Sequence, residues 1–206
     1  MAHRVHAHVR FALNGFALIN RRLPPEVLGI IPSFLFRDRD RIFATHVCRH
    51  WRNTFLSTPS LWNRISAFRH PEKTEIYLER SGDTLLDISI SHNALWTQGG
   101  NDSYRMLYPL SNRWRTVKFR KDRPGMDISA ITQNHCPRLL ELDLEIPDGT
   151  AFHGIDNLNK FPSLKSLTLA GDMRHLRFSQ PFNLRKLGLV AVGRNSGWHL
   201  CWNSSR

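Results

Sequence analysis

The sequence has few of the features that mark secreted, membrane-spanning or metal-dependent proteins. Its three cysteines, at positions 48, 136 and 201, are odd in number and widely spaced, so they provide no disulfide framework and fit a reducing compartment. No apolar run approaches the roughly 20 residues of a membrane-spanning helix. His46-x-Cys48-x-His50 has no second cysteine pair to complete four zinc ligands, so we expect Cys48 to be structural.

Motifs that would indicate a catalytic site are also missing. The chain contains no phosphate-binding glycine loop, and Gly193 to Gly197 does not have the spacing of a nucleophile elbow. Glu141, Asp143 and Glu145 alternate on a predicted strand without histidine partners, which favours a solvated strand face over a metal or acid–base site. We therefore expect a non-catalytic protein without a cofactor or a metal.

Acidic residues are the scarcer charge. The chain has 17 Asp and Glu against 29 Lys and Arg, a formal net charge of +12. Residues 1–22 contain no acid, and we interpret them as a disordered basic leader, with a mitochondrial presequence as the alternative. Such a charge attracts nucleic acid, and in residues 113–123 basic side chains alternate with aromatic ones, as they do in single-strand-binding proteins. Trp114 and Phe119 also fit a repeat core, however, and a basic surface could equally attract an acidic partner.

Residues 23–65 predict short helices with more apolar surface than so small a segment can bury by itself. Pro24 and Pro25 suit the first turn of a helix, and Glu26 suits its positive end. Pro32 is expected to end or kink that helix, because it lacks a backbone donor and clashes one turn back.

A second helix is predicted over residues 43–55, where apolar side chains recur every four positions. The alternating charges of residues 37–41 predict a solvated connector before it. Thr58-Pro59 ends the second helix, and residues 61–65 supply a third apolar turn. The unfilled apolar surface indicates an interface, although a helical subdomain packed on the rest of the chain would show the same pattern.

The order and spacing of these residues resemble the F-box, a small helical module that docks onto a Skp-type adaptor in cullin-based ubiquitin ligases. The resemblance covers about a fifth of the chain, and Pro32 departs from the aromatic residue more usual at its position. It implies adaptor contact or an F-box core role for Leu23, Pro24, Glu26, Val27, Ile31, Leu35, Val47, Cys48, Trp51, Leu61 and Trp62.

Beyond residue 66 the pattern apolar-x-x-apolar-x-apolar recurs five times. Its copies begin at residues 85, 114, 139, 164 and 184, at intervals of 29, 25, 25 and 20 residues. A period in the twenties with Leu-x-x-Leu-x-Leu is typical of a leucine-rich-repeat-like solenoid with one strand per unit. Apolar turns around Ile128 and Ile131, and around Ile155, Leu158 and Phe161, predict brief helices between strands.

Together these patterns predict an α/β fold, α+β in its layout, in which a three-helix F-box precedes a short, degenerate solenoid with parallel strands. Residues 72–80 predict a helix that Ser81-Gly82-Asp83 ends, and residues 92–113 form the loosest insertion. Residues 77–90 also resemble the arrangement after the F-box in fungal F-box proteins. The predicted parts are a basic leader at 1–22, the F-box at 23–65, a helical connector at 66–83, the solenoid at 84–192 and an irregular tail at 193–206.

Alternation along the predicted strands indicates which side chains face outward. We expect a charged, target-binding face, with cross-strand ion pairs of Lys118 with Asp143 and of Arg120 with Glu145 as the simpler interpretation. The candidate face comprises Lys118, Arg120, Glu141, Asp143, Glu145, Thr168 and Lys186.

The resemblance implies a non-catalytic, substrate-recognition adaptor of a Skp-cullin-F-box ubiquitin ligase. The F-box would bind the Skp-type adaptor and, through it, cullin, while the repeats hold a target protein in the cytoplasm or nucleus. The alternatives are a basic nucleic-acid-binding protein and a truncated F-box protein without a target.

Overall fold

The chain divides into two compact units, residues 1–63 with 78–82 (the helical unit) and residues 64–77 with 83–206 (the sheet unit). The predicted basic leader lies outside the described residues, apart from Arg22. The computed structural model describes residues 22–35, 37–66, 70–91, 98–120, 134–146, 155, 157–171, 184–192 and 197–203.

In the described part of the helical unit, α3 (Pro25–Ile30) continues into the 3-10 turn η1 (Ile31–Phe34). Pro25 opens the helix after an extended Pro24, where a missing backbone N–H costs nothing. The predicted end of the helix at Pro32 is confirmed, because regular α-helix stops at Ile30 and the proline lies in the tighter turn.

Two helices follow, α4 (Asp38–Ala44) and α5 (Arg49–Leu56), so the prediction of one helix over residues 43–55 is wrong. The backbone N–H and the hydroxyl of Thr45 both bond back to the carbonyl of Ile42, at 3.0 and 2.7 Å, which closes the first helix. The predicted connector at 37–41 is wrong as well. Asp38 and Asp40 lie in the first turn of α4, where negative charge stabilises a helix.

The 3-10 turn η2 (Pro59–Leu61) completes the helical unit. The hydroxyl of Thr58 donates a hydrogen bond of 2.6 Å to the carbonyl of Thr54, and this contact ends α5 before Pro59. The described buried apolar core of the unit comes from α3, α4, α5, η2 and the residues beside them: Leu28, Ala44, Cys48, Phe55, Leu61 and Trp62.

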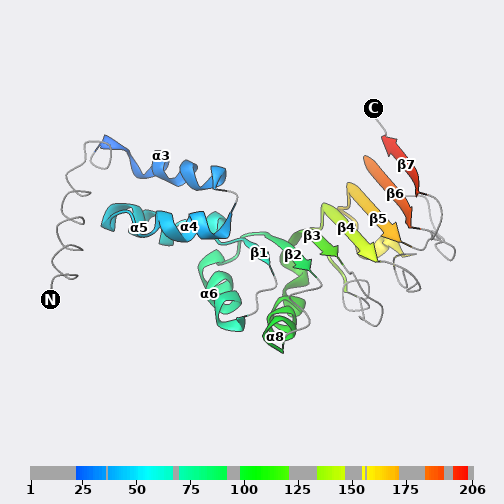
Figure 1. Ribbon diagram of the computed structural model, residues 1–206, viewed down its shortest axis with the longest axis horizontal. Helices are drawn as coiled ribbons and strands as arrows, with labels where there is room; N and C mark the ends of the chain where they lie inside the picture. Colours follow the sequence, from blue (N-terminus) through cyan, green and yellow to red (C-terminus); the bar gives the residue numbers. More distant parts are fainter. Residues whose placement is uncertain are drawn as a thin grey trace. The chain divides into compact units, whose positions relative to one another are not determined.

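The sheet unit contains one seven-stranded sheet whose strands lie side by side in chain order (Figure 1). Neighbouring strands are parallel, except that β7 runs antiparallel to β6. The mixed helix and parallel-strand architecture expected from the sequence is confirmed. The strands are β1 (Arg64–Ser66), β2 (Leu86–Ser91), β3 (Trp114–Arg120), β4 (Glu141–Ile146), β5 (Ser166–Gly171), β6 (Lys186–Val192) and β7 (Gly197–Asn203).

The repeated apolar positions are in register across the parallel strands. One row is Ile88, Val117, Leu142, Leu167 and Leu187, and the next is Ile90, Phe119, Leu144, Leu169 and Leu189. The members on β2 to β5 are at most 2% exposed, so both rows lie on the inner face.

The first repeat differs from the prediction at its start. Leu86 is fully buried and pairs with Trp114, whereas Leu85 is half-buried. The register shifts after this pair, because Asp87 lies opposite Thr116 and Arg115 is the extra residue.

Helices connect the early strands. The predicted end of α6 (Pro71–Ser81) is confirmed, since Gly82 adopts a φ of +51°, a conformation that glycine allows without strain.

The loose insertion predicted at 92–113 is wrong over its described part. Residues 98–107 form α8 (Gln98–Leu107), and the 3-10 helix η3 (Tyr108–Arg113) leads into β3. The buried side of α8 carries Gly100, Ser103 and Leu107, which are spaced three and four residues apart as on one face of a helix. Two of the three are small and not apolar in character, so the sequence shows no hydrophobic periodicity there. Near β5, η4 (Leu158–Lys160) confirms the brief helix predicted there, while Ile128 and Ile131 lie outside the described residues.

Both ends of the sheet extend beyond the predicted solenoid. Since β1 pairs with β2, the sheet begins at residue 64 and not at 84. The irregular tail predicted after residue 192 is wrong for β7, which pairs with β6 along seven residues. The alternation of Trp198, Leu200 and Trp202 was the sequence signal for this strand.

Candidate functional site

The helical unit exposes large apolar side chains along its first helices. On α3 and η1, Val27 is 43% exposed, Ile30 57% and Phe34 68%, while Leu28 between them is fully buried. Phe43 on α4 is also 57% exposed. Several large apolar side chains exposed on so short a segment indicate an interaction site.

The sequence-predicted interface residues fall into three groups by exposure. Pro24, Glu26 and Val27 are exposed, and Cys48, Leu61 and Trp62 are buried in the core. The half-buried group is Leu23, Ile31, Leu35, Val47 and Trp51.

Sequence reasoning left three exposed residues out of the predicted site, Ile30, Phe34 and Phe43. The available signal was the density of the apolar run, which one buried helix face cannot accommodate.

Specific polar contacts fix the packing of the helical unit. Arg41, 7% exposed, donates from Nη1 to the carbonyl of Leu61 at 2.7 Å, and the indole N–H of Trp62 donates to the carbonyl of Phe55 at 3.0 Å. The guanidinium of Arg80 lies 4.6 Å from the ring centre of Trp62. These contacts hold the ends of α4, α5 and η2 together.

Trp51 connects the surface to the core. Its ring meets that of Phe55 edge-on, with centres 5.4 Å apart. Its indole Nε1 is buried and makes no hydrogen bond to any residue that the structure describes.

The sheet unit brings the predicted target-binding residues onto one face. Glu141, Asp143 and Glu145 alternate along β4, each opposite an outward residue of β3 and β5. Of the seven predicted residues, Asp143 and Thr168 are half-buried and the others exposed. The sheet therefore places an acidic strand beside a strand carrying Lys118 and Arg120.

The two predicted cross-strand pairs differ. Arg120 and Glu145 form an ion pair, with Nε and Oε2 at 3.6 Å. Lys118 and Asp143 are Cα partners, but these two described side chains form no ion pair with each other.

Sequence reasoning missed a stronger pair, Arg115 with Asp87. Arg115 Nε donates to Asp87 Oδ1 at 2.8 Å and Nη2 donates to Oδ2, a two-point contact that raises the pKa of Arg115. The neighbouring Arg113 donates to the carbonyl of Thr84 at 3.0 and 3.2 Å, and burial lowers its pKa. The spacing of the apolar residues in the repeat does not reveal the bulge at Arg115, so the contact of its guanidinium with Asp87 could not be predicted from that pattern.

The described residues contain no group of three or more His, Cys, Asp or Glu side chains placed to hold a metal ion. Cys48 is buried, whereas His46 is exposed. Burial also raises the pKa of the Cys136 thiol to about 12, which makes it a poor nucleophile at neutral pH. No described helix has the length and apolar character to cross a membrane.

One comparison with known proteins identifies part of the chain. Residues 21–67 match the family model described as F-box-like, and the predicted segment 23–65 lies inside that range. The match supports an F-box protein, a class of generally non-catalytic adaptors, with a Skp-type partner. Among curated proteins and among solved structures, nothing matches the chain.

Proposed function

We propose that the chain is the substrate-recognition subunit of a Skp-cullin-F-box ubiquitin ligase. The F-box-like match at residues 21–67 is the observation that carries this proposal. The chain itself supplies no chemistry in this role. It holds a target protein near the ubiquitin-loaded conjugating enzyme and so raises the effective concentration of the target lysine.

The adaptor-binding surface is the exposed apolar side of the helical unit. Ile30, Phe34 and Phe43 are each more than half exposed, and removing such apolar area from water favours association, offset in part by the entropy lost on binding. The half-buried Trp51 and Leu35 contribute adaptor contact or its support. Burial against an adaptor explains why so short a segment carries so many apolar residues.

The target-binding part is a short, leucine-rich-repeat-like solenoid. Strands in chain order, joined in parallel and carrying two stacked apolar rows, support this assignment. The outward positions of β3 to β6 then form a charged recognition surface. The fungal type of F-box protein is part of this proposal through the resemblance of residues 77–90 to fungal F-box proteins, and cullin-based ligases of this kind would place the chain in the cytoplasm or nucleus.

Co-expression and pull-down with a Skp-type adaptor tests the proposal. We expect the wild-type chain to capture the adaptor and an Ile30→Ala/Phe34→Ala variant to lose most of it. An Ile76→Ala/Met106→Ala variant is the matched control, because it removes exposed apolar side chains from the sheet unit. Circular dichroism establishes that each variant is folded. Equal capture by both variants, or none by folded wild type, would contradict the proposal.

A further inference from the structure

Basic side chains gather where the parallel strands β4, β5 and β6 begin. Lys165 N donates to the carbonyl of Leu140 at 2.9 Å, and Arg185 N donates to the carbonyl of Lys165 at 2.8 Å. Leu140, Lys165 and Arg185 are therefore successive rungs, each about 4.8 Å from the next. We call the end of the sheet where these strands begin the strand-entry edge. Its exposed cations are Arg138, Lys165, Arg185 and Lys186.

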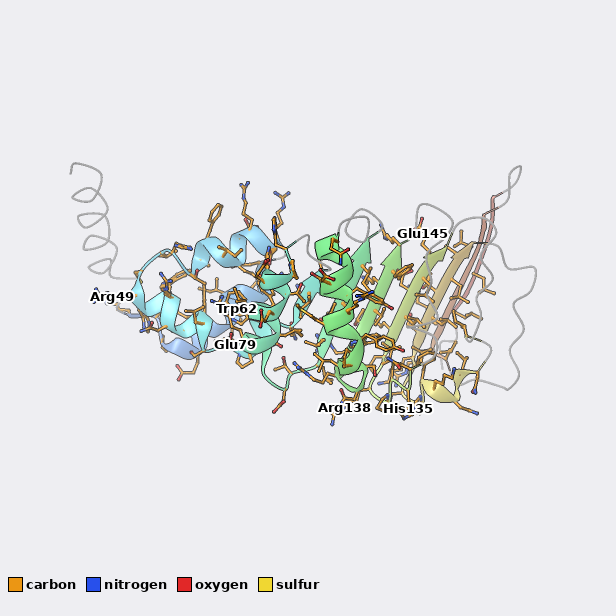
Figure 2. The ribbon with its side chains drawn as sticks, turned by 90° about the horizontal axis from the view of Figure 1, so that it is seen from below. Arg49, Trp62, Glu79, His135, Arg138 and Glu145 are labelled. Carbon is orange, nitrogen blue, oxygen red and sulfur yellow. The ribbon has the colours of Figure 1, made fainter. Side chains whose placement is uncertain are left out.

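The charge at this edge is strongly unbalanced. Among the described residues of the entry turns and first strand positions, five cations face one carboxylate: Arg138, Lys160, Lys165, Arg185 and Lys186 against Glu141. The other acids of β4 lie further along the strand. Figure 2 shows Arg138 and His135 near one another at the end of the sheet where the strands begin, and Glu145 at the other end of the strands.

These cations are available to a ligand. Arg138, Lys165, Arg185 and Lys186 are all exposed, and within the described part of the chain none of the four has an ion-pair partner. Arg115 and Arg120, in contrast, are paired with Asp87 and Glu145. The basic residues of β3 are thus partly neutralised, while those at the entry of β5 and β6 pair with no acid that the structure describes.

Among the described residues of β3 to β6, no exposed aromatic side chain offers a platform for stacking bases. From β3 to β6, the described aromatic side chains are Trp114, Phe119 and Phe161, and each is at most 2% exposed. Single-stranded nucleic acid gains much of its affinity from stacking on exposed aromatics. Exposed cations without aromatics fit carboxylate side chains better.

We propose that the strand-entry edge binds a short acidic peptide segment, rich in glutamate or aspartate. Three rungs span about 10 Å, the length of about three residues of extended chain. Carboxylates of the segment pair with Lys165, Arg185 and Lys186. That this binding selects a ubiquitination target rests on the proposed function, whereas the binding itself does not.

Fluorescence anisotropy of the full-length chain with a labelled oligoglutamate peptide, at low ionic strength, tests this site. We expect Lys165→Ala/Arg185→Ala to weaken binding roughly fivefold, since each exposed charge pair contributes modestly. Arg64→Ala/Arg105→Ala removes the same charge from exposed positions of β1 and α8, and we expect it to change the affinity less than about twofold. Circular dichroism checks the fold of both variants.

Three results would overturn the proposal: equal weakening in both variants, no weakening in the entry-edge variant, or tighter binding of an oligothymidylate of equal length that depends on Lys165 and Arg185. The last result would assign the edge to nucleic acid. Adaptor capture by the same variants separates this proposal from the function above. A chain that binds oligoglutamate through Lys165 and Arg185 but captures no adaptor keeps the site and loses the ligase role.

Discussion

Arg41 and Leu61, twenty residues apart in sequence, are joined by a buried hydrogen bond of 2.7 Å from Nη1 to the backbone carbonyl. This contact ties α4 to the 3-10 turn that precedes the sheet. The arginine was expected in a solvated connector, yet it is 7% exposed and also bonds Asp38 of its own helix. A charge-assisted bond to a buried carbonyl stabilises more than a neutral one.

Arg41→Ala is expected to lower the free energy of unfolding by about 1–3 kcal/mol, because the carbonyl of Leu61 loses its charged donor in a buried setting. Arg52→Ala, at an exposed position of α5, should change it by less than about 0.5 kcal/mol. Urea denaturation of the two variants makes the comparison. Equal effects would mean that the Arg41 contact contributes nothing specific.

The two ion pairs of the sheet should differ in strength. Asp87→Ala removes the two-point contact with Arg115 and is expected to destabilise the chain by about 1 kcal/mol. Glu145→Ala removes the exposed, 3.6 Å contact with Arg120 and should cost less than about 0.5 kcal/mol. Thermal unfolding measures both, and a larger loss in the Glu145 variant would be inconsistent with this ranking.

Two glycines should respond to alanine in opposite directions. Gly82 has a φ of +51°, so Gly82→Ala is expected to destabilise by about 1 kcal/mol through backbone strain. Gly29 lies inside α3 with open space at its Cβ position, so Gly29→Ala should stabilise by about 0.5–1 kcal/mol. Chemical denaturation distinguishes the signs. Stabilisation by Gly82→Ala would refute the assigned conformation.

The Cys136 thiol predicts a pH dependence in alkali. Its pKa is about 12 in the folded chain and ordinarily 9.0, so above pH 9 the unfolded chain loses this proton before the folded one. The stability of the wild type relative to Cys136→Ala should therefore be constant below pH 9 and fall as the pH rises toward 12. Parallel denaturation curves at pH 8 and pH 10.5 test this. An unchanged difference would show that the thiol ionises as freely when folded.

The repeated part of the fold was readable because its signal is periodic. Leu142, Leu167 and Leu187 each occupy the second apolar position of a repeat, and in the sheet they lie in one row. Outward positions follow from the same alternation, so the placement of Lys118 and Arg120 was also predictable.

The parts that sequence reasoning missed depend on local competition between contacts. The four-residue spacing of Phe43, Val47 and Trp51 favoured one helix, but the bonds from Thr45 to Ile42 end it. Helix α8 packs through Gly100 and Ser103, which give no apolar signal.

Exposure was the least predictable property of the helical unit. Leu28 and Ile30 are both aliphatic and two residues apart, yet one is fully buried and the other 57% exposed. The sequence shows that the segment has surplus apolar residues. Which of them remain outside is decided by how α3 packs against its neighbours.

The most direct test of the central claim is calorimetric titration of the purified chain with a purified Skp-type adaptor at several temperatures. We predict a complex whose formation has a negative heat-capacity change, because Ile30, Phe34 and Phe43 leave water on binding. The change should be smaller for Ile30→Ala/Phe34→Ala. A folded chain that forms no complex with the adaptor at any of these temperatures would contradict the account.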